Sequence, residues 1–91
     1  GPNFVLHPSS FILPVLFFAA ARDLAGADSA AVELPPGATV ADLRAELARR
    51  FPALAALLAK SAVAVNHDFA EDHRVVAPAD EVAVIPPVSG G

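Results

Sequence analysis

The sequence ends in an apolar run that stops at two prolines and is followed by two glycines. Residues 82–85 are apolar and mostly β-branched, which is typical of a buried strand. Pro86 and Pro87 lack a backbone N–H, so they cannot continue a central strand and instead direct the chain away from the sheet. The pattern predicts an extended arm over residues 86–91, which could span roughly 20 Å.

The two last glycines predict that this arm enters a narrow slot in another protein. Glycine loses the most conformational freedom when it is ordered, so two idle glycines would be costly. Gly90 and Gly91 have no Cβ that blocks a close approach. A frayed end or a cloning remnant is the alternative, but the strand, the two prolines, Val88 and Ser89 before the glycines favour a functional arm.

Length and composition indicate one small domain with its own core. The chain has 91 residues, of which 55% are hydrophobic. A net charge of −4 without a basic stripe argues against nucleic acid as the main partner. Cysteine is absent, which excludes disulfides, thiolate metal sites and a cysteine nucleophile. Any sulfur chemistry would therefore need a group other than a side-chain thiol.

The first apolar run, residues 11–21, is similar to the apolar part of a secretory signal. It has no basic segment before it, Pro14 interrupts it, and it is shorter than the ~20 residues of a membrane span. We therefore expect a core strand, no membrane contact and a cytoplasmic protein. Gly1 and Pro2 are typical of an expression remnant. Residues 1–11 are expected to form a tail, and residues 12–91 one domain.

The hydrophobic periods predict the element order β-β-α-β-β-β. The expected strands are residues 13–20, 30–34, 62–66, 73–77 and 82–85, with a turn or short helical loop at 22–26 and turns at 66–68 and 78–80. The first two strands should pair as a hairpin. The main helix begins after Thr39, which with Asp42 approximates a capping box. Pro52 stops this helix and is expected to begin a short second one.

The main helix carries its apolar side chains on one stripe. The stripe consists of Val40, Leu43, Leu47 and Phe51. Glu46 and Arg50, four residues apart on another face, are predicted to form a solvated ion pair.

One helix can cover only one face of the predicted sheet, yet several strands are apolar on both faces. An antiparallel or mixed sheet with one solvated face should alternate apolar and polar residues. The second apolar face therefore predicts a docking surface for another protein. Loops that fold over it, or an alanine-rich composition alone, are the alternatives.

Few residues suggest chemistry within the chain. A Walker loop, a dinucleotide turn and a His-Glu-x-x-His motif are absent from the sequence. The polar segment with His67, Asp68, Glu71, Asp72 and His73 fits no strong metal template, so a surface loop is favoured over a metal site. No general base can be assigned to Ser89. The carboxylate of Gly91 remains, and it becomes electrophilic only if another enzyme activates it, for example by adenylylation.

Six segments together resemble the MoaD family, the small sulfur-carrying subunits of molybdopterin synthase. They are residues 15–19 (VLFFA), 22–26 (RDLAG), 39–43 (TVADL), 63–66 (VAVN), 80–83 (DEVA) and 86–91 (PPVSGG). The resemblance covers about residues 13–91. It implies a ubiquitin-like β-grasp fold of the α+β class, with a mixed sheet of four to five strands packed on one main helix.

The resemblance also implies a non-catalytic carrier that binds no cofactor of its own. An activating enzyme that uses ATP and magnesium would adenylylate Gly91, which would then become a thiocarboxylate. The arm would enter the large subunit of molybdopterin synthase, in a heterotetramer. It would give sulfur to cyclic pyranopterin monophosphate in molybdenum cofactor biosynthesis.

The family pattern assigns partner contacts to several further residues. Phe18 and Ile85 match hydrophobic contacts to partners, and Arg22 matches a basic contact to the activating enzyme. The arm adds Pro86, Pro87, Val88, Ser89 and Gly90. No metal site is implied.

Three other functions stay open at this point. The chain could be a sulfur carrier for thiazole or cysteine synthesis or for tRNA thiolation, a ubiquitin-like modifier that is conjugated to lysines, or a binding domain with an inert arm.

Overall fold

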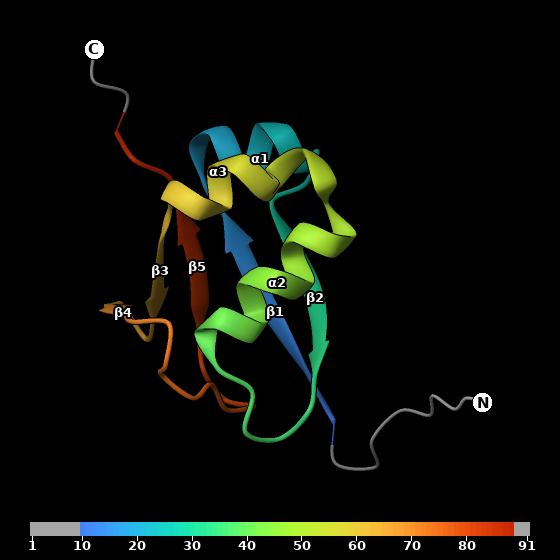
Figure 1. Ribbon diagram of the computed structural model, residues 1–91, viewed down its shortest axis with the longest axis vertical. Helices are drawn as coiled ribbons and strands as arrows, with labels where there is room; N and C mark the ends of the chain where they lie inside the picture. The colour runs from blue at the N-terminus through green and yellow to red at the C-terminus, as the bar shows by residue number, and fades with distance from the viewer. Residues whose placement is uncertain (1–9, 89–91) are drawn as a thin grey trace, which may run out of the picture.

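A five-stranded sheet with all helices on one side makes up the domain, and the computed structural model describes residues 10–88 of it (Figure 1). The elements follow one another as β1 (Phe11–Phe17), α1 (Ala19–Ala25), β2 (Ser29–Leu34), α2 (Val40–Arg50), η1 (Pro52–Leu54), α3 (Ala55–Lys60), β3 (Ala62–Val65), β4 (Asp68–Ala70) and β5 (Val82–Ile85). None of the helices between residues 10 and 88 is long and apolar enough to cross a membrane.

The strands lie in the order β2-β1-β5-β3-β4. β1 pairs in parallel with β5 and antiparallel with β2, while β3 pairs antiparallel with both β5 and β4. The first and last strands of the chain thus lie side by side in the middle of the sheet. This mixed sheet on one main helix confirms the predicted β-grasp architecture.

Pro14 occurs within β1 without breaking the strand. It is paired with Ala31 of β2, whereas pairing with β5 begins only at Val15. A proline is tolerated where its missing N–H would face an unpaired edge. Residues 11–17 of the apolar run that could be mistaken for a signal segment therefore form a strand of the core sheet, as predicted for this part of the run.

The main helix α2 begins with the predicted capping box. The Asp42 backbone N–H donates to Thr39 Oγ1 at 3.3 Å, and the Thr39 backbone N–H donates to Asp42 Oδ2 at 2.9 Å. Two otherwise unpaired donors of the first turn are thereby satisfied. The predicted short helix after Pro52 is also present, as η1 followed by α3.

The core lies between the helices and the sheet face that they cover. Val40, Leu43 and Leu47 of α2 are fully buried, as the apolar stripe predicts. Phe51, at the end of the stripe, packs edge-to-face on Phe17 with ring centroids 5.6 Å apart. Such pairs add to the stabilisation that comes from burial alone.

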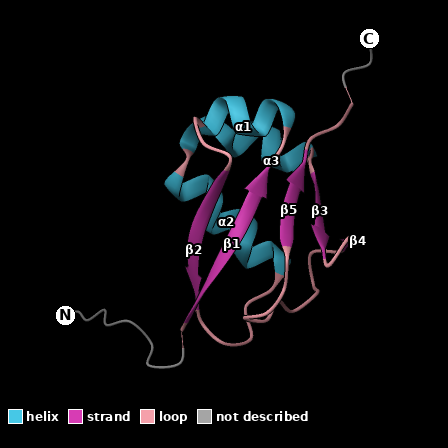
Figure 2. Cartoon of the chain, turned by 180° about the vertical axis from the view of Figure 1, so that it is seen from behind, coloured by secondary structure: helices cyan, strands magenta, loops and turns pink. Residues whose placement is uncertain are grey.

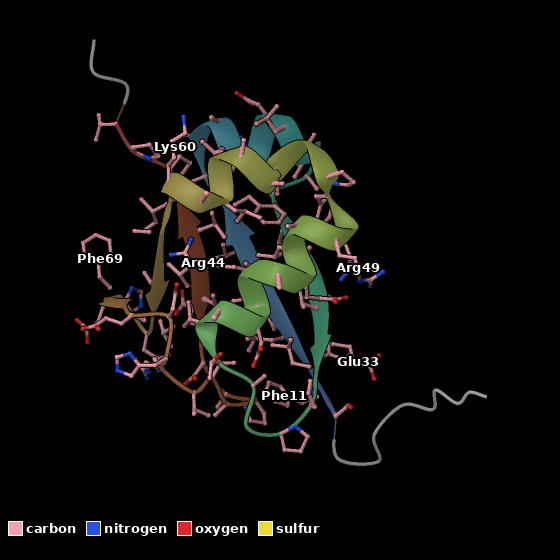
Figure 3. All side chains as sticks on the ribbon, in the orientation of Figure 1. Phe11, Glu33, Arg44, Arg49, Lys60 and Phe69 are labelled. Atoms are coloured by element: carbon pink, nitrogen blue, oxygen red, sulfur yellow. The ribbon has the colours of Figure 1, made fainter. Side chains whose placement is uncertain are left out.

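Arg44 ties α2 to the layer beside it. Its Nε donates to Asp72 Oδ1 at 2.8 Å, and its Nη1 donates to the carbonyl oxygen of Leu58 at the end of α3. Figure 3 shows this side chain reaching from α2 towards the strands. The two contacts connect the main helix with a second helix and with the loop before β5.

The predicted ion pair between Glu46 and Arg50 is wrong. Glu46 pairs instead with Arg49, whose Nε and Nη2 lie 3.1 and 2.6 Å from its two carboxylate oxygens. Arg50 donates to the carbonyl oxygen of Ala31 in β2 and lies over the Phe51 ring. Arg50 therefore binds a carbonyl oxygen of the edge strand β2 rather than the carboxylate of Glu46, one helical turn away.

The first strand was predicted to run over residues 13–20, and its true bounds differ at both ends. β1 begins at Phe11, which pairs with Leu34 and packs against the core, so the expected tail of residues 1–11 overlaps it. β1 ends at Phe17 because the alanine-rich residues 19–25 form the helix α1, where Ala21 is buried. Alanine has the highest helix propensity, and this outweighs the continuing apolar pattern.

The expected strand at residues 73–77 is also wrong. Only Val75 forms an isolated bridge, to Thr39, and the edge strand is β4 at residues 68–70. The predicted turn at 66–68 is shorter, because Asn66 and His67 alone connect β3 to β4. This two-residue turn places Asp68 directly opposite Val65, which begins a ladder that sequence alone did not indicate.

Candidate functional site

The sheet face turned away from the helices, which we call the outer face, remains open. Figure 2 views the sheet from this side, with the helices behind it, and no helix of residues 10–88 lies over the strands. Phe18 is 48% exposed, and Phe69 is 76% exposed. The described part of the chain therefore leaves the second apolar face without a covering helix, and the predicted docking of a partner there stays a prediction.

The strand register brings apolar residues of four strands into one row on the outer face. Leu16 is paired with Ala83, Ala83 with Ala64, and Ala64 with Phe69. Directly paired residues point to the same side of a sheet. In the neighbouring row, Ile85 is paired with Ala62.

A shallow hollow of about 280 Å³ lies along these rows. Its lining is mainly apolar and consists of Leu16, Phe18, Ala64, His67, Glu81, Ala83 and Ile85. Small-molecule sites usually enclose about 300–1,000 Å³ of a deeper cleft. The size and chemistry of the hollow suit one or two apolar side chains of a protein partner.

The carboxyl-terminal arm leaves the sheet at one end of this hollow. β5 ends at Ile85, which lines the hollow, and the chain continues through half-buried Pro86 and exposed Pro87. In Figure 1 residues 86–88 (red) run away from the domain beyond the end of β5, and Val88 is 91% exposed. The predicted site residues Ser89, Gly90 and Gly91 lie outside the described residues.

The two titratable residues of the lining lie at the opposite end from the arm. Glu81 precedes β5, and Ile85 ends it, so about 13 Å of strand separates their backbones. His67 Nε2 is 3.2 Å from Glu81 Oε1. Within residues 10–88, the hollow therefore has no acid–base pair beside the point where the arm leaves the sheet.

Two further residues singled out in the sequence differ in their relation to the hollow. Phe18, between β1 and α1, lines the hollow, and its contact with a partner stays a prediction. Arg22 is exposed on α1 and is not part of the lining. A basic contact through Arg22 would therefore extend the surface onto the helix rather than belong to the hollow.

Sequence reasoning missed Phe69. The turn was expected to extend to Asp68 and the next strand to begin only at residue 73, so Phe69 fell within the segment that was predicted to be a polar surface loop. Figure 3 shows its ring projecting outward from β4 at the edge of the sheet. The available signal was the apolar pair Phe69 and Ala70 directly after the turn.

The polar segment at residues 67–73 does not gather into a metal site. His67 lies beside Glu81, whereas His73 Nδ1 is 3.6 Å from Glu71 Oε1. Within residues 10–88, no group of three or more His, Asp or Glu side chains is arranged to hold a metal ion.

Helix α2 carries a carboxyl group with a shifted pKa. The hydrogen bonds from Arg49 to Glu46 hold the pKa of that carboxyl below its usual value of 4.5, and the nearby charges of Arg49 and Arg50 act in the same direction. This pair lies on α2, on the side of the sheet away from the hollow. It stabilises the helix surface and takes no part in the outer face.

Known proteins match this chain along most of its length. The ThiS family model matches residues 15–91. A molybdopterin synthase sulfur carrier subunit of Arabidopsis thaliana is 37% identical over 91% of this chain and 86% of its own length. The corresponding proteins of Chlamydomonas reinhardtii and Homo sapiens are 37% and 35% identical, and the match covers 98% and 91% of their lengths.

Solved structures show the same fold. The small archaeal modifier protein SAMP1 of Haloferax volcanii has a TM-score of 0.79 at 30% identity, over 88% of this chain and 99% of its own. A complex of subunits 1 and 2 of the molybdopterin-converting factor of Helicobacter pylori has a TM-score of 0.61 over 89% of this chain and 100% of the matched one. At 21% identity the latter shows the fold alone. The chain therefore belongs to the ThiS family, and the relatives that it matches over most of their length are molybdopterin synthase sulfur carrier subunits.

Proposed function

We propose that this chain is the sulfur-carrier subunit of a molybdopterin synthase and that it carries sulfur on Gly91. The observation that carries the proposal is the match to molybdopterin synthase sulfur carrier subunits over most of their length, and the family match runs through the arm to residue 91. The geometry supports it, because the arm departs from a strand beside an apolar hollow that has no catalytic group next to the arm.

The carrier chemistry uses the carboxylate of Gly91 as the reacting group. One carboxylate oxygen attacks the α-phosphate of ATP, with magnesium bound to the phosphates, and pyrophosphate leaves. A sulfur nucleophile at the oxidation level of sulfide then attacks the acyl carbon, and AMP leaves. The resulting thiocarboxylate gives its sulfur to cyclic pyranopterin monophosphate, and water restores the carboxylate. All catalytic side chains in this scheme belong to partners.

Two partners follow from this chemistry. An activating adenylyltransferase forms the acyl-adenylate, and the large subunit of molybdopterin synthase receives the arm in a heterotetramer. Both would use the outer face, with Phe18 and Ile85 as apolar anchors beside the point where the arm leaves. Phe69 extends the same apolar row, and Arg22 adds a basic contact at its border. A cytoplasmic location accords with this assignment and stays a prediction.

Mass spectrometry of the intact protein tests the chemistry directly. Incubation with the cognate activating enzyme, ATP and a sulfur donor should replace one oxygen by sulfur, a gain of about 16 Da. Deletion of Gly91, or addition of one alanine after it, should abolish both this gain and molybdopterin formation, while the circular dichroism spectrum is unchanged. Sulfur transfer by either variant would count against Gly91 as the carrier.

A ubiquitin-like modifier is the second candidate, because SAMP1 is 30% identical to this chain and has the same fold. A modifier would form an amide between Gly91 and a lysine of another protein. Tagged chain expressed in its own host would then appear in covalent adducts that resist boiling in detergent and a reducing agent. A carrier would instead be recovered as the free chain, partly as thiocarboxylate.

A further inference from the structure

In the turn between β3 and β4, a residue other than glycine adopts a backbone conformation that is usually found at glycine. Asn66 and His67 have φ angles of 54° and 72°, the left-handed pair that a tight hairpin of two residues requires. Asparagine tolerates this region, but glycine is the residue that normally occupies the second position. The imidazole of His67 is 80% exposed, so core packing does not explain why a histidine occupies this position.

The histidine instead lies against Glu81 at the end of the hollow. Its Nε2 is 3.2 Å from Glu81 Oε1. The backbone of Glu81 is held on both sides: its N–H donates to Asn66 Oδ1 at 2.9 Å, and its carbonyl oxygen accepts from the Asn66 N–H at 2.7 Å. The backbone of Glu81 is thus fixed at the border of an apolar hollow, and its exposed carboxylate lies beside His67.

The neighbouring acid, Asp80, is used within the domain. Its Oδ1 accepts from Asn66 Nδ2 at 2.9 Å, and its Oδ2 accepts from the Ala77 N–H at 2.7 Å. Glu81, by contrast, has a side chain that is 58% exposed, and no donor between residues 10 and 88 occupies its Oε2. Of the two adjacent carboxylates, Glu81 is the one that can accept a bond from outside.

We propose that the end of the hollow formed by His67 and Glu81 recognises a lysine or arginine of the large subunit. The partner places an apolar side chain in the hollow and its cation against Glu81 Oε2, while His67 holds the other carboxylate oxygen. The backbones of Glu81 and of Ile85, after which the arm begins, lie about 13 Å apart along β5. This separation fixes the direction in which the partner lies relative to the arm. This inference rests on the proposed function, since it defines the partner of the same surface.

The test compares association kinetics of Glu81→Gln with those of the unaltered chain, using the purified large subunit of the same organism. Removal of a charge at the border of an interface acts mainly on the association rate and on its salt dependence. We expect the association rate constant to fall about threefold to fivefold at low salt and to converge with that of the unaltered chain in 0.5 M NaCl, where the Debye length is only about 4 Å.

Glu33→Gln is the matched control. Glu33 lies in β2 at the opposite edge of the sheet from Phe69, as Figure 3 shows, and is paired with Ile12 on the outer face. It loses the same charge outside the hollow, so its association rate should change little. An equal effect of both variants would show that only net charge matters, and would overturn the proposal.

His67→Gly separates the recognition role from the turn. Glycine removes the backbone strain, so the melting temperature should stay equal or rise, while the association rate constant falls. Glu81→Gln combined with His67→Gly should add little to Glu81→Gln alone. Association of the single variants at the unaltered rate, with sulfur transfer intact, would overturn this inference and leave the carrier function standing. Failure of the unaltered chain both to bind the large subunit and to gain sulfur would overturn both.

Discussion

The two faces of the sheet both carry apolar residues, but one face is buried by the helices and the other is left open. Along β1, Leu13, Val15 and Phe17 point to the helices and are buried, whereas Leu16 points to the outer face with Phe18 beyond it. Neighbouring side chains of one strand therefore differ only in what covers them. An apolar residue becomes core where α2 lies over it, and part of a candidate interface where no element of the described chain does.

The comparison teaches that hydrophobicity alone does not measure a contribution to folding. Burial of a leucine or phenylalanine side chain stabilises by about 1.5–3 kcal/mol, and an exposed one does not supply this free energy. The apolar side chains of the outer face would supply this free energy only if a partner covered them. Substitutions on the two faces should consequently separate folding from binding.

The largest effect on stability is expected from the covered face. Leu47→Ala removes a fully buried side chain of α2 and should lower the free energy of unfolding by about 2–5 kcal/mol. Urea denaturation measures it. Leu24→Ala, at an α1 position that is 49% exposed, is the control and should stay within about 0.5 kcal/mol of the unaltered chain. Equal losses would mean that exposure does not distinguish these positions.

The outer face should show the reverse behaviour. Phe18→Asp places a charge in the hollow and should weaken binding to the large subunit by about 2 kcal/mol or more, the size of an interface hot spot, with a far smaller loss of stability. Isothermal titration calorimetry and a thermal melt measure the two quantities. Leu24→Asp is matched in exposure, 49% against 48%, but lies outside the hollow. Unfolding of the Phe18 variant would show that this residue belongs to the core.

The smallest effect concerns the ion pair on the helix layer. Because the pKa of Glu46 is lowered below 4.5 in the folded chain, its contribution is complete above that pH and disappears as the pH falls through the lowered value. Both side chains reach solvent, where water and salt screen the pair, so the contribution should be small. Glu46→Gln should therefore slightly reduce the loss of unfolding free energy that is measured as the pH falls below 4.5. Partner binding should be unchanged. A shift in binding would place α2 within the interface.

Local patterns predicted the elements whose stabilisation is local. The capping box at Thr39 and the apolar stripe of α2 were predicted because a helix repeats every few residues and ends on recognisable side chains. The apolar strands and the uncovered second face followed from the same reasoning. The Glu46–Arg50 pair failed because several partners were available to each side chain, and only the packed structure selects among them.

The strand at the edge of the sheet, β4, was harder to predict from the sequence. β4 is three residues long, and a strand so short carries too little alternation to be separated from a loop. Its existence depends on pairing with β3 through the turn at Asn66, which is a contact between segments rather than a property of either. Phe69 and the His67–Glu81 contact were missed for that reason.

By itself, the sequence determined that one small domain presents a strand, two prolines and a glycine pair, because proline geometry and the absence of a Cβ act on each residue in isolation. The tertiary structure decided which apolar face is covered, where Phe69 lies, and that Glu81 and His67 meet at the end of the hollow opposite the arm. Those features join residues that are distant along the chain. They arise only when β1 pairs with β5 and α2 packs on one side of the sheet.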